Sequence, residues 1–188
     1  MLTAMNILGI SGSLRKDSFN TKLLRAAVAL APADVSIQIY DGLGALPLYN
    51  EDVRAAGAPP EVTRLRETIR GADALLIVTP EYNYSVPGVL KNAIDWASRP
   101  PQDQPMAGKP LGIMGASGGL GGTMRAQYHL RQIAVFVDML PLNKPEVMVR
   151  NAAEKFDAAG ALVDETTKDF VKQMVEGLAA WARRLAPR

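Results

Sequence analysis

Five short apolar runs, separated by amphipathic segments, constrain the fold of this chain more than any other feature. The runs cover residues 5–10, 35–40, 74–78, 111–116 and 139–149. Helical patterns cover residues 20–25, 61–70, 89–97, 123–136 and 166–185. The third run, ALLIV, is apolar throughout, as is typical of a central strand in a parallel sheet. Repeated strand and helix units with short links predict an α/β protein with a doubly wound, five-stranded parallel sheet covered by helices on both faces.

Three stretches fit this pattern less closely. The fifth run contains Pro141 and Pro145 and is expected to be interrupted, because proline cannot donate a ladder hydrogen bond. Residues 41–60 are expected to form a loop containing Gly and Pro, and residues 151–161 an exposed loop or turn. The last helix is expected to bury one face, formed by Phe170, Met174, Leu178 and Trp181.

Composition narrows the class of protein further. The 188 residues are 48% apolar and 21% charged, as expected for a single globular domain over residues 1–188. The formal net charge of +2 is too small to indicate nucleic-acid binding. No apolar run reaches the ~18–20 residues of a membrane span, and the N-terminus lacks a signal-peptide pattern, so a cytoplasmic location is expected.

Cysteine is absent and His129 is the single histidine. These counts argue against disulfides, cysteine nucleophiles, a Ser-His-Asp triad and a metal site built on Cys or His. Any redox chemistry would therefore depend on a bound organic cofactor.

Residues 9–20, GISGSLRKDSFN, connect the first predicted strand to the first predicted helix. Hydroxyl and amide side chains, a cation and a helix N-terminus together favour binding of a phosphate group. The candidate residues are Ser11, Ser13, Arg15, Ser18 and Asn20. The alternative is a helix cap followed by a solvated turn. The stretch is neither a P-loop nor a GxGxxG fingerprint, and it is typical of a mononucleotide loop of the flavodoxin type.

The loops after the third and fourth strands should meet this first loop, because ligands bind at the carboxyl ends of parallel strands. Residues 79–88, TPEYNYSVPG, are stiffened by two prolines and carry two tyrosines that could flank a planar ring. The alternative is an ordinary turn with surface tyrosines. Residues 116–123, ASGGLGGT, contain four glycines that allow close backbone approach.

The helix that follows carries Arg125, Tyr128 and His129 on one face, by their spacing of three and four residues. Arg125 either attracts an anionic substrate or forms a salt bridge or a subunit contact, and the sequence leaves both open. His129 is expected to be structural. Tyr84, Trp96, Tyr128 and Arg125 are expected to form an exposed aromatic face that suggests a subunit contact.

Four blocks carry a family resemblance: residues 12–20, PLYNEDV at 47–53, TPEYNYSVPGVLKNAIDWASRP at 79–100, and residues 108–133. The chain resembles the NAD(P)H-dependent FMN reductase family, and within it the bacterial chromate and quinone reductases, which are close to some azoreductases. The similarity runs from about residue 6 to residue 149. It implies a flavodoxin-like fold and a cytoplasmic oxidoreductase with non-covalent FMN, NAD(P)H as co-substrate, and quinones, chromate or azo compounds as acceptors.

The resemblance also implies roles for particular residues. The FMN phosphate would be held by Ser11, Ser13, Arg15, Ser18, Asn20 and Thr21. The isoalloxazine ring would be bound by Pro80, Glu81, Tyr82 and Asn83. The ribityl chain and ring would be bordered by Ser117, Gly118 and Gly119. The family forms dimers or tetramers, so a homodimer or homotetramer is expected, with Tyr84, Arg125, Tyr128 and Glu146 as candidates for the interface or the active-site rim.

No catalytic acid or base is required, because the flavin carries the hydride chemistry and a ping-pong mechanism follows. The competing function is a flavodoxin-like electron carrier without a small-molecule acceptor of its own. Such carriers need strongly charged docking surfaces, which the near-neutral charge does not favour. A signalling receiver domain would need acidic residues where Ser11, Gly12 and Ser13 stand, and is rejected.

Overall fold

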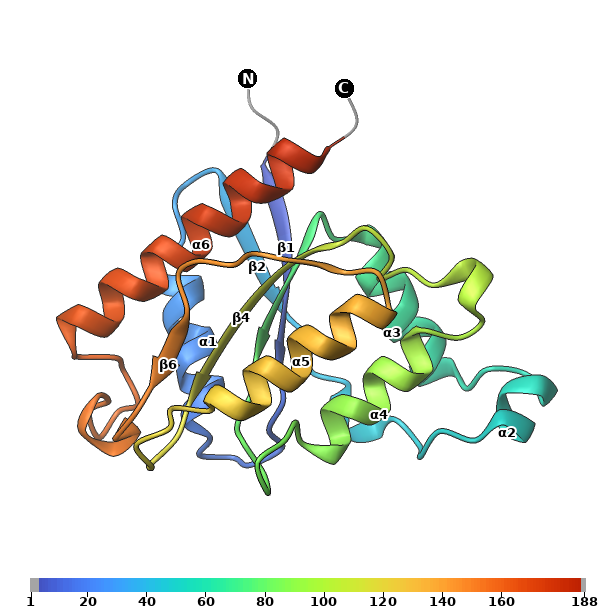
Figure 1. The fold of residues 1–188 in the computed structure, drawn as a ribbon, viewed down its shortest axis with the longest axis horizontal. Helices are drawn as coiled ribbons and strands as arrows, with labels where there is room; N and C mark the ends of the chain where they lie inside the picture. The colour runs from blue at the N-terminus through green and yellow to red at the C-terminus, as the bar shows by residue number, and fades with distance from the viewer. Residues whose placement is uncertain (1–3, 187–188) are drawn as a thin grey trace.

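The predicted strands form one parallel sheet in a computed structural model that describes residues 4–186. The strand order is β2-β1-β3-β4-β5, which is the flavodoxin-like doubly wound topology. The strands are β1 Met5–Ser11, β2 Val35–Ile39, β3 Ala74–Val78, β4 Pro110–Ala116, β5 Leu140–Pro141 and β6 Val147–Val149. Their carboxyl ends point to the lower edge of the molecule in Figure 1.

The fifth position of the sheet is shared by two short strands. β5 pairs with the beginning of β4, where Leu140 lies beside Pro110. β6 pairs with the end of β4, where Val149 lies beside Ala116. The interruption predicted from Pro141 and Pro145 is confirmed, because the single run from residue 139 to residue 149 is divided into these two strands.

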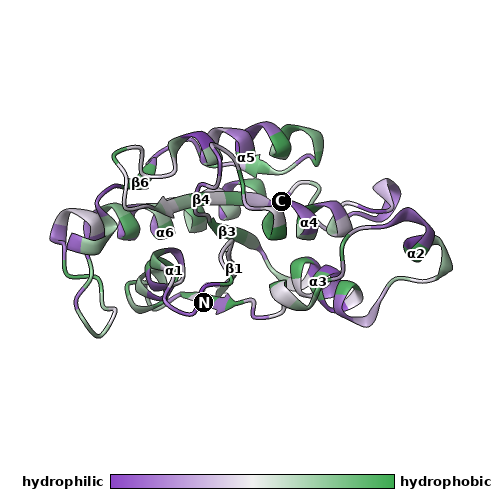
Figure 2. Cartoon of the chain, turned by 90° about the horizontal axis from the view of Figure 1, so that it is seen from below, coloured by the Kyte–Doolittle hydropathy of each residue, from purple (hydrophilic) through white to green (hydrophobic). Residues whose placement is uncertain are grey.

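Helices cover both faces of the sheet, as predicted. Seen from below, α1 and α6 lie on one side of the strands and α3 and α4 on the other (Figure 2). The helices are α1 Phe19–Ala29, α2 Glu51–Ala56, α3 Pro60–Gly71, α4 Gly88–Ala97, α5 Met124–Phe136 and α6 Glu165–Leu185. Short 3₁₀ turns cover Leu43–Ala45, Pro101–Asp103 and Ala152–Glu154. None of the helices within residues 4–186 has the length and apolar character needed to cross a membrane.

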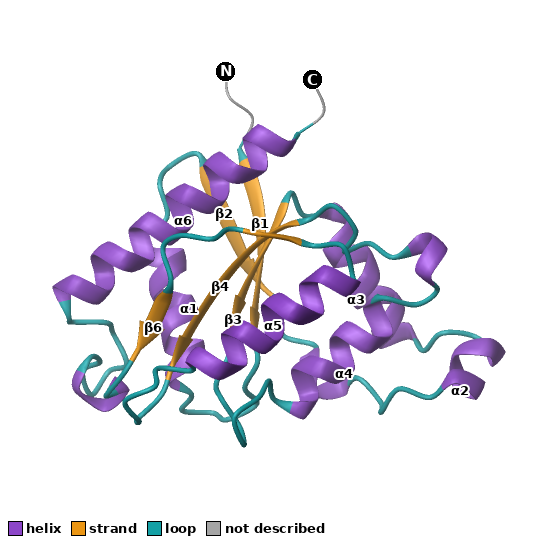
Figure 3. Cartoon of the chain, in the orientation of Figure 1, coloured by secondary structure: helices purple, strands orange, loops and turns teal. Residues whose placement is uncertain are grey.

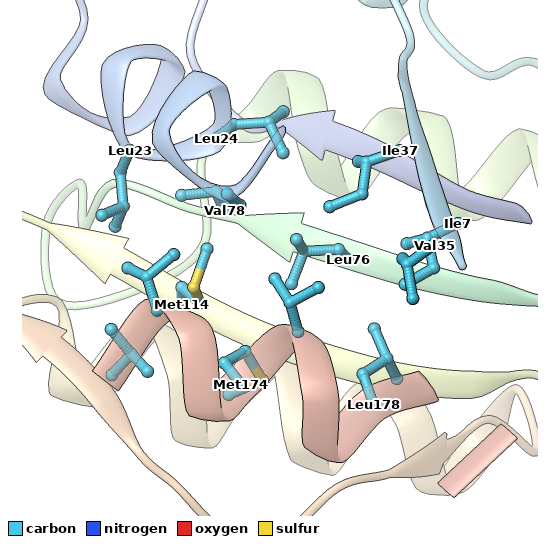
Figure 4. Packing of buried hydrophobic residues seen from close by; sticks show 14 of the residues in the cluster. Ile7, Leu23, Leu24, Val35, Ile37, Leu76, Val78, Met114, Met174 and Leu178 are labelled. Atoms are coloured by element: carbon cyan, nitrogen blue, oxygen red, sulfur yellow. The ribbon is translucent and has the colours of Figure 1, made fainter. Parts of the chain in front are cut away.

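One core lies between the sheet and helices α1 and α6 (Figure 4). Leu23 and Leu24 of α1 and Met174 and Leu178 of α6 are fully buried there. Phe170, expected on the same face of α6, is 44% exposed, and Val171 and Val175 take the inward positions instead. This core fixes the first turn of α1 against the end of the sheet.

The second core lies between the sheet and helices α3, α4 and α5. Its largest member is Trp96 of α4, which is only 1% exposed. Its indole N–H donates to the Pro47 carbonyl at 2.8 Å, and its ring meets the Tyr49 ring edge-on at 4.9 Å between centroids. The expectation that Trp96 belongs to an exposed aromatic face is therefore wrong, although Tyr84 and Tyr128 are exposed.

Two of the expected loops contain more structure than the sequence pattern indicated. Residues 41–60 include α2, which starts at an Asn50 cap and extends away from the body of the molecule (Figure 3). Residues 151–161 are only partly exposed, because the Phe156 ring is buried and stacks on Phe19 at 5.8 Å. That contact anchors the segment to the start of α1.

The beginning of β1 and the end of α6 meet at the edge of the sheet opposite the carboxyl ends (Figure 1). The Met5 N–H donates to the Asp34 carbonyl at 2.9 Å. Arg183 near the end of α6 forms an ion pair with the Asp34 carboxylate at 2.5 Å. One residue thus holds both ends of the fold.

Candidate functional site

Three loops meet at the carboxyl edge of the sheet, after β1, β3 and β4 (Figure 1). Backbone hydrogen bonds extend the ladders past the strand ends: Gly12 N–H donates to Val78 O and Thr79 N–H to Met114 O, both at 2.9 Å. A Cβ built on Gly12 would lie 3.2 Å from Thr79 Oγ1 and 3.3 Å from Pro80 Cδ. The first two loops are therefore in close contact, as predicted from strand order.

The loop after β1 presents hydroxyl groups around the N-terminus of α1. Ser18 caps the helix, its Oγ accepting the N–H groups of Asn20 at 3.2 Å and Thr21 at 3.4 Å. The hydroxyl groups of Ser11 and Thr21 form a hydrogen bond of 2.8 Å. Among the described residues, the first turn of α1 carries no acidic side chain. The helix dipole, the Ser18 hydroxyl proton and the one proton that the Ser11–Thr21 hydrogen bond leaves over can therefore act on an anion.

Two charged residues complete this loop. Arg15 is exposed, with one guanidinium N–H donating to the Asp17 carbonyl at 3.2 Å and its backbone N–H donating to Ser13 Oγ at 3.3 Å. The Asp17 carboxylate is paired with Lys22 at 3.0 Å, and this hydrogen bond lowers the pKa of Asp17. Because Lys22 offsets the Asp17 carboxylate, the Arg15 charge can act on a ligand.

Asn20 has a role that the sequence pattern did not predict. Its side chain is 3% exposed and forms two hydrogen bonds with the backbone of Ala116, one to the carbonyl and one from the N–H, each 2.9 Å long. The amide thus links the first turn of α1 to the end of β4, where the glycine loop begins. Both ends of the Asn20 amide are thus bonded to Ala116, and not directed at the predicted phosphate position.

The loop after β3 forms a tight two-residue hairpin. Tyr82 and Ser85 exchange both backbone hydrogen bonds at 3.0 Å. Asn83 and Tyr84 between them have φ angles of 49° and 65°. Positive φ at both central residues matches a type I′ turn, which is costly for tyrosine and persists only where the surroundings hold it. The hairpin presents the exposed rings of Tyr82 and Tyr84.

Two contacts from this loop reach α5. Ser85 Oγ lies 2.9 Å from His129 Nδ1, which agrees with the structural role expected for the histidine. Glu81 accepts the backbone N–H of Arg125 at 2.9 Å and forms an ion pair with its guanidinium at 3.0 Å. The sequence left Arg125 either to attract an anionic substrate or to form a salt bridge or a subunit contact, and the structure contains the salt bridge. Glu81 itself turns toward α5.

The glycine loop after β4 combines two kinds of glycine. A Cβ on Gly115 would lie 1.9 Å from Thr123 Oγ1, and one on Gly122, which has a φ of 53°, would lie 2.6 Å from Met148 O. The fold itself requires those two. A Cβ on Gly118 would meet no heavy atom of the described chain within 4 Å, so the open space there suits a bound ligand. Ser117 Oγ donates to Gly119 O at 3.2 Å.

Tyr128 and Glu146, predicted at the rim, lie together. The Tyr128 hydroxyl donates to Glu146 Oε1 at 3.1 Å, and Lys144 Nζ donates to Oε2 at 3.0 Å. The Lys144 contact lowers the pKa of Glu146. Nearby, Gln127 is fully buried and donates to Thr123 Oγ1 at 3.1 Å and to Val147 O at 2.9 Å. Gln127 belongs to no recognisable motif, and its spacing of four residues from Thr123 is the signal in the sequence that indicates this contact.

These features define a flavodoxin-like protein in which three loops meet at the carboxyl edge of the sheet, where such folds bind a mononucleotide. The hydroxyls, Arg15 and the helix N-terminus fit the phosphate of FMN. The tyrosine hairpin and the open space at Gly118 fit a planar ring system.

Comparison with known proteins assigns the family. Residues 5–154 match the model of the NADPH-dependent FMN reductase family, and the chain belongs to that family. It is 58% identical over 181 residues to an NAD(P)H-dependent FMN reductase of Pseudomonas aeruginosa, covering 96% of this chain and 97% of the relative. It is 45% identical over 181 residues to a 2-hydroxy-1,4-benzoquinone reductase of a Burkholderia species, with the same coverage.

A solved structure agrees with this assignment. The flavoenzyme NAD(P)H:(acceptor) oxidoreductase FerB of Paracoccus denitrificans superposes with a TM-score of 0.88 at 38% identity, covering 96% of this chain and 98% of that one. The protein is therefore an oxidoreductase that uses FMN and NAD(P)H.

Proposed function

We propose that this enzyme reduces quinones to quinols with NAD(P)H by a ping-pong mechanism. The observation that carries the proposal is that a capped helix start, with no acidic side chain in its first turn among the described residues, lies at the same sheet edge as the exposed hairpin tyrosines and the open space at Gly118. The 45% identity to a benzoquinone reductase supports quinones as acceptors.

The loops divide the work of holding the cofactor. Ser11, Ser13, Arg15 and Thr21, with the capped start of α1, would hold the phosphate. Tyr82, Asn83 and the stretch from Ser117 to Gly119 would border the ring, and Pro80 would stiffen the loop behind it. When bound, FMN would supply the two-electron redox chemistry that connects NAD(P)H with the acceptor.

The protein's own part is to place donor and acceptor in turn on one open face. If donor and acceptor share one site between the hairpin and the glycine loop, NAD(P)⁺ would have to leave before the quinone enters. Positioning at near-attack distance is then the main catalytic contribution of the chain. No acid or base is assigned to the residues of the rim.

The finer features of the proposal concern acceptors and assembly. We include chromate and azo compounds as further acceptors. We also include a homodimer or homotetramer whose contact involves the exposed Tyr84, Arg125 and Tyr128 and the half-buried Glu146. We also propose a cytoplasmic location. The alternative function is a flavodoxin-like electron carrier. The near-neutral charge, +2 in total, gives little support to the strongly charged docking surface of a carrier.

Fluorescence titration of the apoprotein tests the phosphate site. Arg15→Ala should weaken FMN binding by about 1.5–3 kcal/mol, because a charge-assisted hydrogen bond is lost. Riboflavin, which lacks the phosphate, should bind the variant as it binds the wild type. Arg25→Ala, an exposed arginine further along α1, is the matched control and should leave FMN affinity unchanged.

Steady-state kinetics test the reaction. Initial rates with NADPH and 1,4-naphthoquinone should give parallel lines in double-reciprocal plots. Intersecting lines would show that both substrates bind together and would contradict the ping-pong proposal. In stopped-flow experiments the FMN-loaded enzyme should oxidise NADPH rapidly, and a failure to do so would favour the electron carrier, which has no small-molecule substrate of its own.

A further inference from the structure

Helix α5 begins without a cap of its own, although it follows directly on the glycine loop of the site. Its N-cap residue, Thr123, has a φ of 71° and makes no capping bond within residues 4–186. The Thr123 hydroxyl instead accepts a hydrogen bond from Gln127 Nε2 at 3.1 Å. The Met124 N–H donates to the Gly121 carbonyl at 2.9 Å, but the next N–H groups of α5 need an acceptor from elsewhere.

Glu81 supplies that acceptor from a different loop, 44 residues earlier in the chain. Its Oε2 accepts the N–H groups of Arg125 at 2.9 Å and Ala126 at 3.2 Å. Its Oε1 lies 3.0 Å from the Arg125 guanidinium, and the Glu81 side chain is only 12% exposed. One carboxylate thus caps a helix and neutralises a cation.

Arg125 extends this contact back to the hairpin. Its guanidinium carbon lies 3.9 Å from the centre of the Tyr84 ring, within the range of a cation–π contact. Tyr84 is the hairpin residue with a φ of 65°. Glu81, Arg125 and Tyr84, which we call the Glu81 latch, therefore join the loop after β3 to the start of α5.

We propose that Glu81 is a positioning residue of this site, which holds Arg125 over Tyr84 and offsets its charge toward acceptors. The inference rests on the proposed quinone reductase function. An incoming anion meets a paired Glu81 and Arg125 instead of an isolated cation, so the wild-type site gains little attraction for negatively charged acceptors. Removing either charge should change that selectivity, and in opposite directions.

Charge-altering variants test the latch in the FMN-loaded enzyme. Glu81→Gln keeps an oxygen that can accept the helix N–H groups but leaves the Arg125 charge unpaired. Arg125→Met keeps the cap but leaves the Glu81 charge unpaired. The readout is kcat/KM for 1,4-naphthoquinone-2-sulfonate divided by that for neutral 1,4-naphthoquinone, measured at low and high salt.

Relative to the wild type, the ratio should rise about threefold or more in Glu81→Gln and fall in Arg125→Met, as expected for one partly exposed charge. Both changes should shrink at high salt. The double variant should return toward the wild-type ratio. Equal losses for the two quinones, or a Glu81→Gln effect that persists in the double variant, would overturn the proposal.

Asp164→Asn is the matched control. Asp164 also caps a helix, accepting Thr167 N–H at 2.9 Å, and also pairs with a lysine, Lys155, at 2.8 Å. It belongs to α6, so its loss should lower stability without changing the acceptor ratio.

A second readout does not require quinone turnover. The decreases in melting temperature of the FMN-loaded variants should be non-additive. The double variant should lose less than the sum of the decreases in the two single variants. Additive shifts would show that the two side chains do not act as a pair. If the wild type failed to reduce either quinone, the proposed function would fail, while this thermal cycle would still decide the latch.

Discussion

Replacing Asn20 by alanine should destabilise the protein far more than the loss of one surface polar group. The side chain is buried and its two hydrogen bonds to Ala116 are both 2.9 Å long. Each bond contributes about 0.5–1.5 kcal/mol net, and each buried partner left unsatisfied costs about 1–3 kcal/mol. With partial entry of water, we expect Asn20→Ala to lower the free energy of unfolding by about 2–4 kcal/mol.

Urea unfolding of the apoprotein measures this loss through tryptophan fluorescence, to which the buried Trp96 and the half-buried Trp181 both contribute. The apoprotein is preferred because bound FMN would add its own stabilisation. Asn20→Asp should also be destabilised, because a carboxylate accepts the Ala116 N–H but cannot donate to the Ala116 carbonyl.

Ser18→Ala is the control, since it removes the cap of the same helix and should cost about 1 kcal/mol. An Asn20→Ala loss no larger than the Ser18→Ala loss would refute the reasoning, because the link to β4 would then contribute nothing measurable.

Three further predictions concern other parts of the fold. Gly115→Ala should lower the free energy of unfolding by about 2–3 kcal/mol or more, because its Cβ would lie 2.5 Å from the Thr79 carbonyl; denaturation of the variant that matched wild type would contradict this. Arg66→Met should lower the free energy of unfolding by about 2–4 kcal/mol, because the buried Arg66 guanidinium donates to the carbonyls of Ala97 at 3.0 Å and Asp103 at 2.6 Å. An unchanged melting temperature would show that water replaces these bonds. Asp164 has its pKa lowered from 3.8 to about 2, chiefly by the Lys155 hydrogen bond, so its stabilisation is present above pH 4 and is lost as the pH falls toward 2. Melts of wild type and Asp164→Asn should therefore differ at pH 7 and converge near pH 2, and a constant difference would exclude this carboxylate as the cause.

The sheet could be predicted because its strands are short apolar runs with clear limits. α2 was missed for the opposite reason. It has six residues and no buried side chain, so it has no apolar stripe to detect. The remaining signal was local: Asn50 as a cap, followed by Glu51 and Asp52 in the first turn.

The place of the site was also predictable, since the carboxyl ends of adjacent parallel strands meet at one edge. The partner of each side chain was not. Asn20 pairs with Ala116, 96 residues away, and Glu81 with Arg125, 44 residues away. Such choices depend on the distance between loops in the folded chain, which no local pattern contains. Phe156 was missed because a single aromatic residue in a polar segment has no periodicity.

The attachment of both the start of β1 and the end of α6 to Asp34 has a practical consequence for building devices from this protein. β1 begins and α6 ends at the edge opposite the three loops, so a linker added at either end should leave the loops unobstructed. Tethering the molecule to an electrode through such a linker would turn the tyrosine hairpin toward the solution. Diffusing molecules could then reach it freely, while electron exchange with the metal surface would have to cross the full length of the strands.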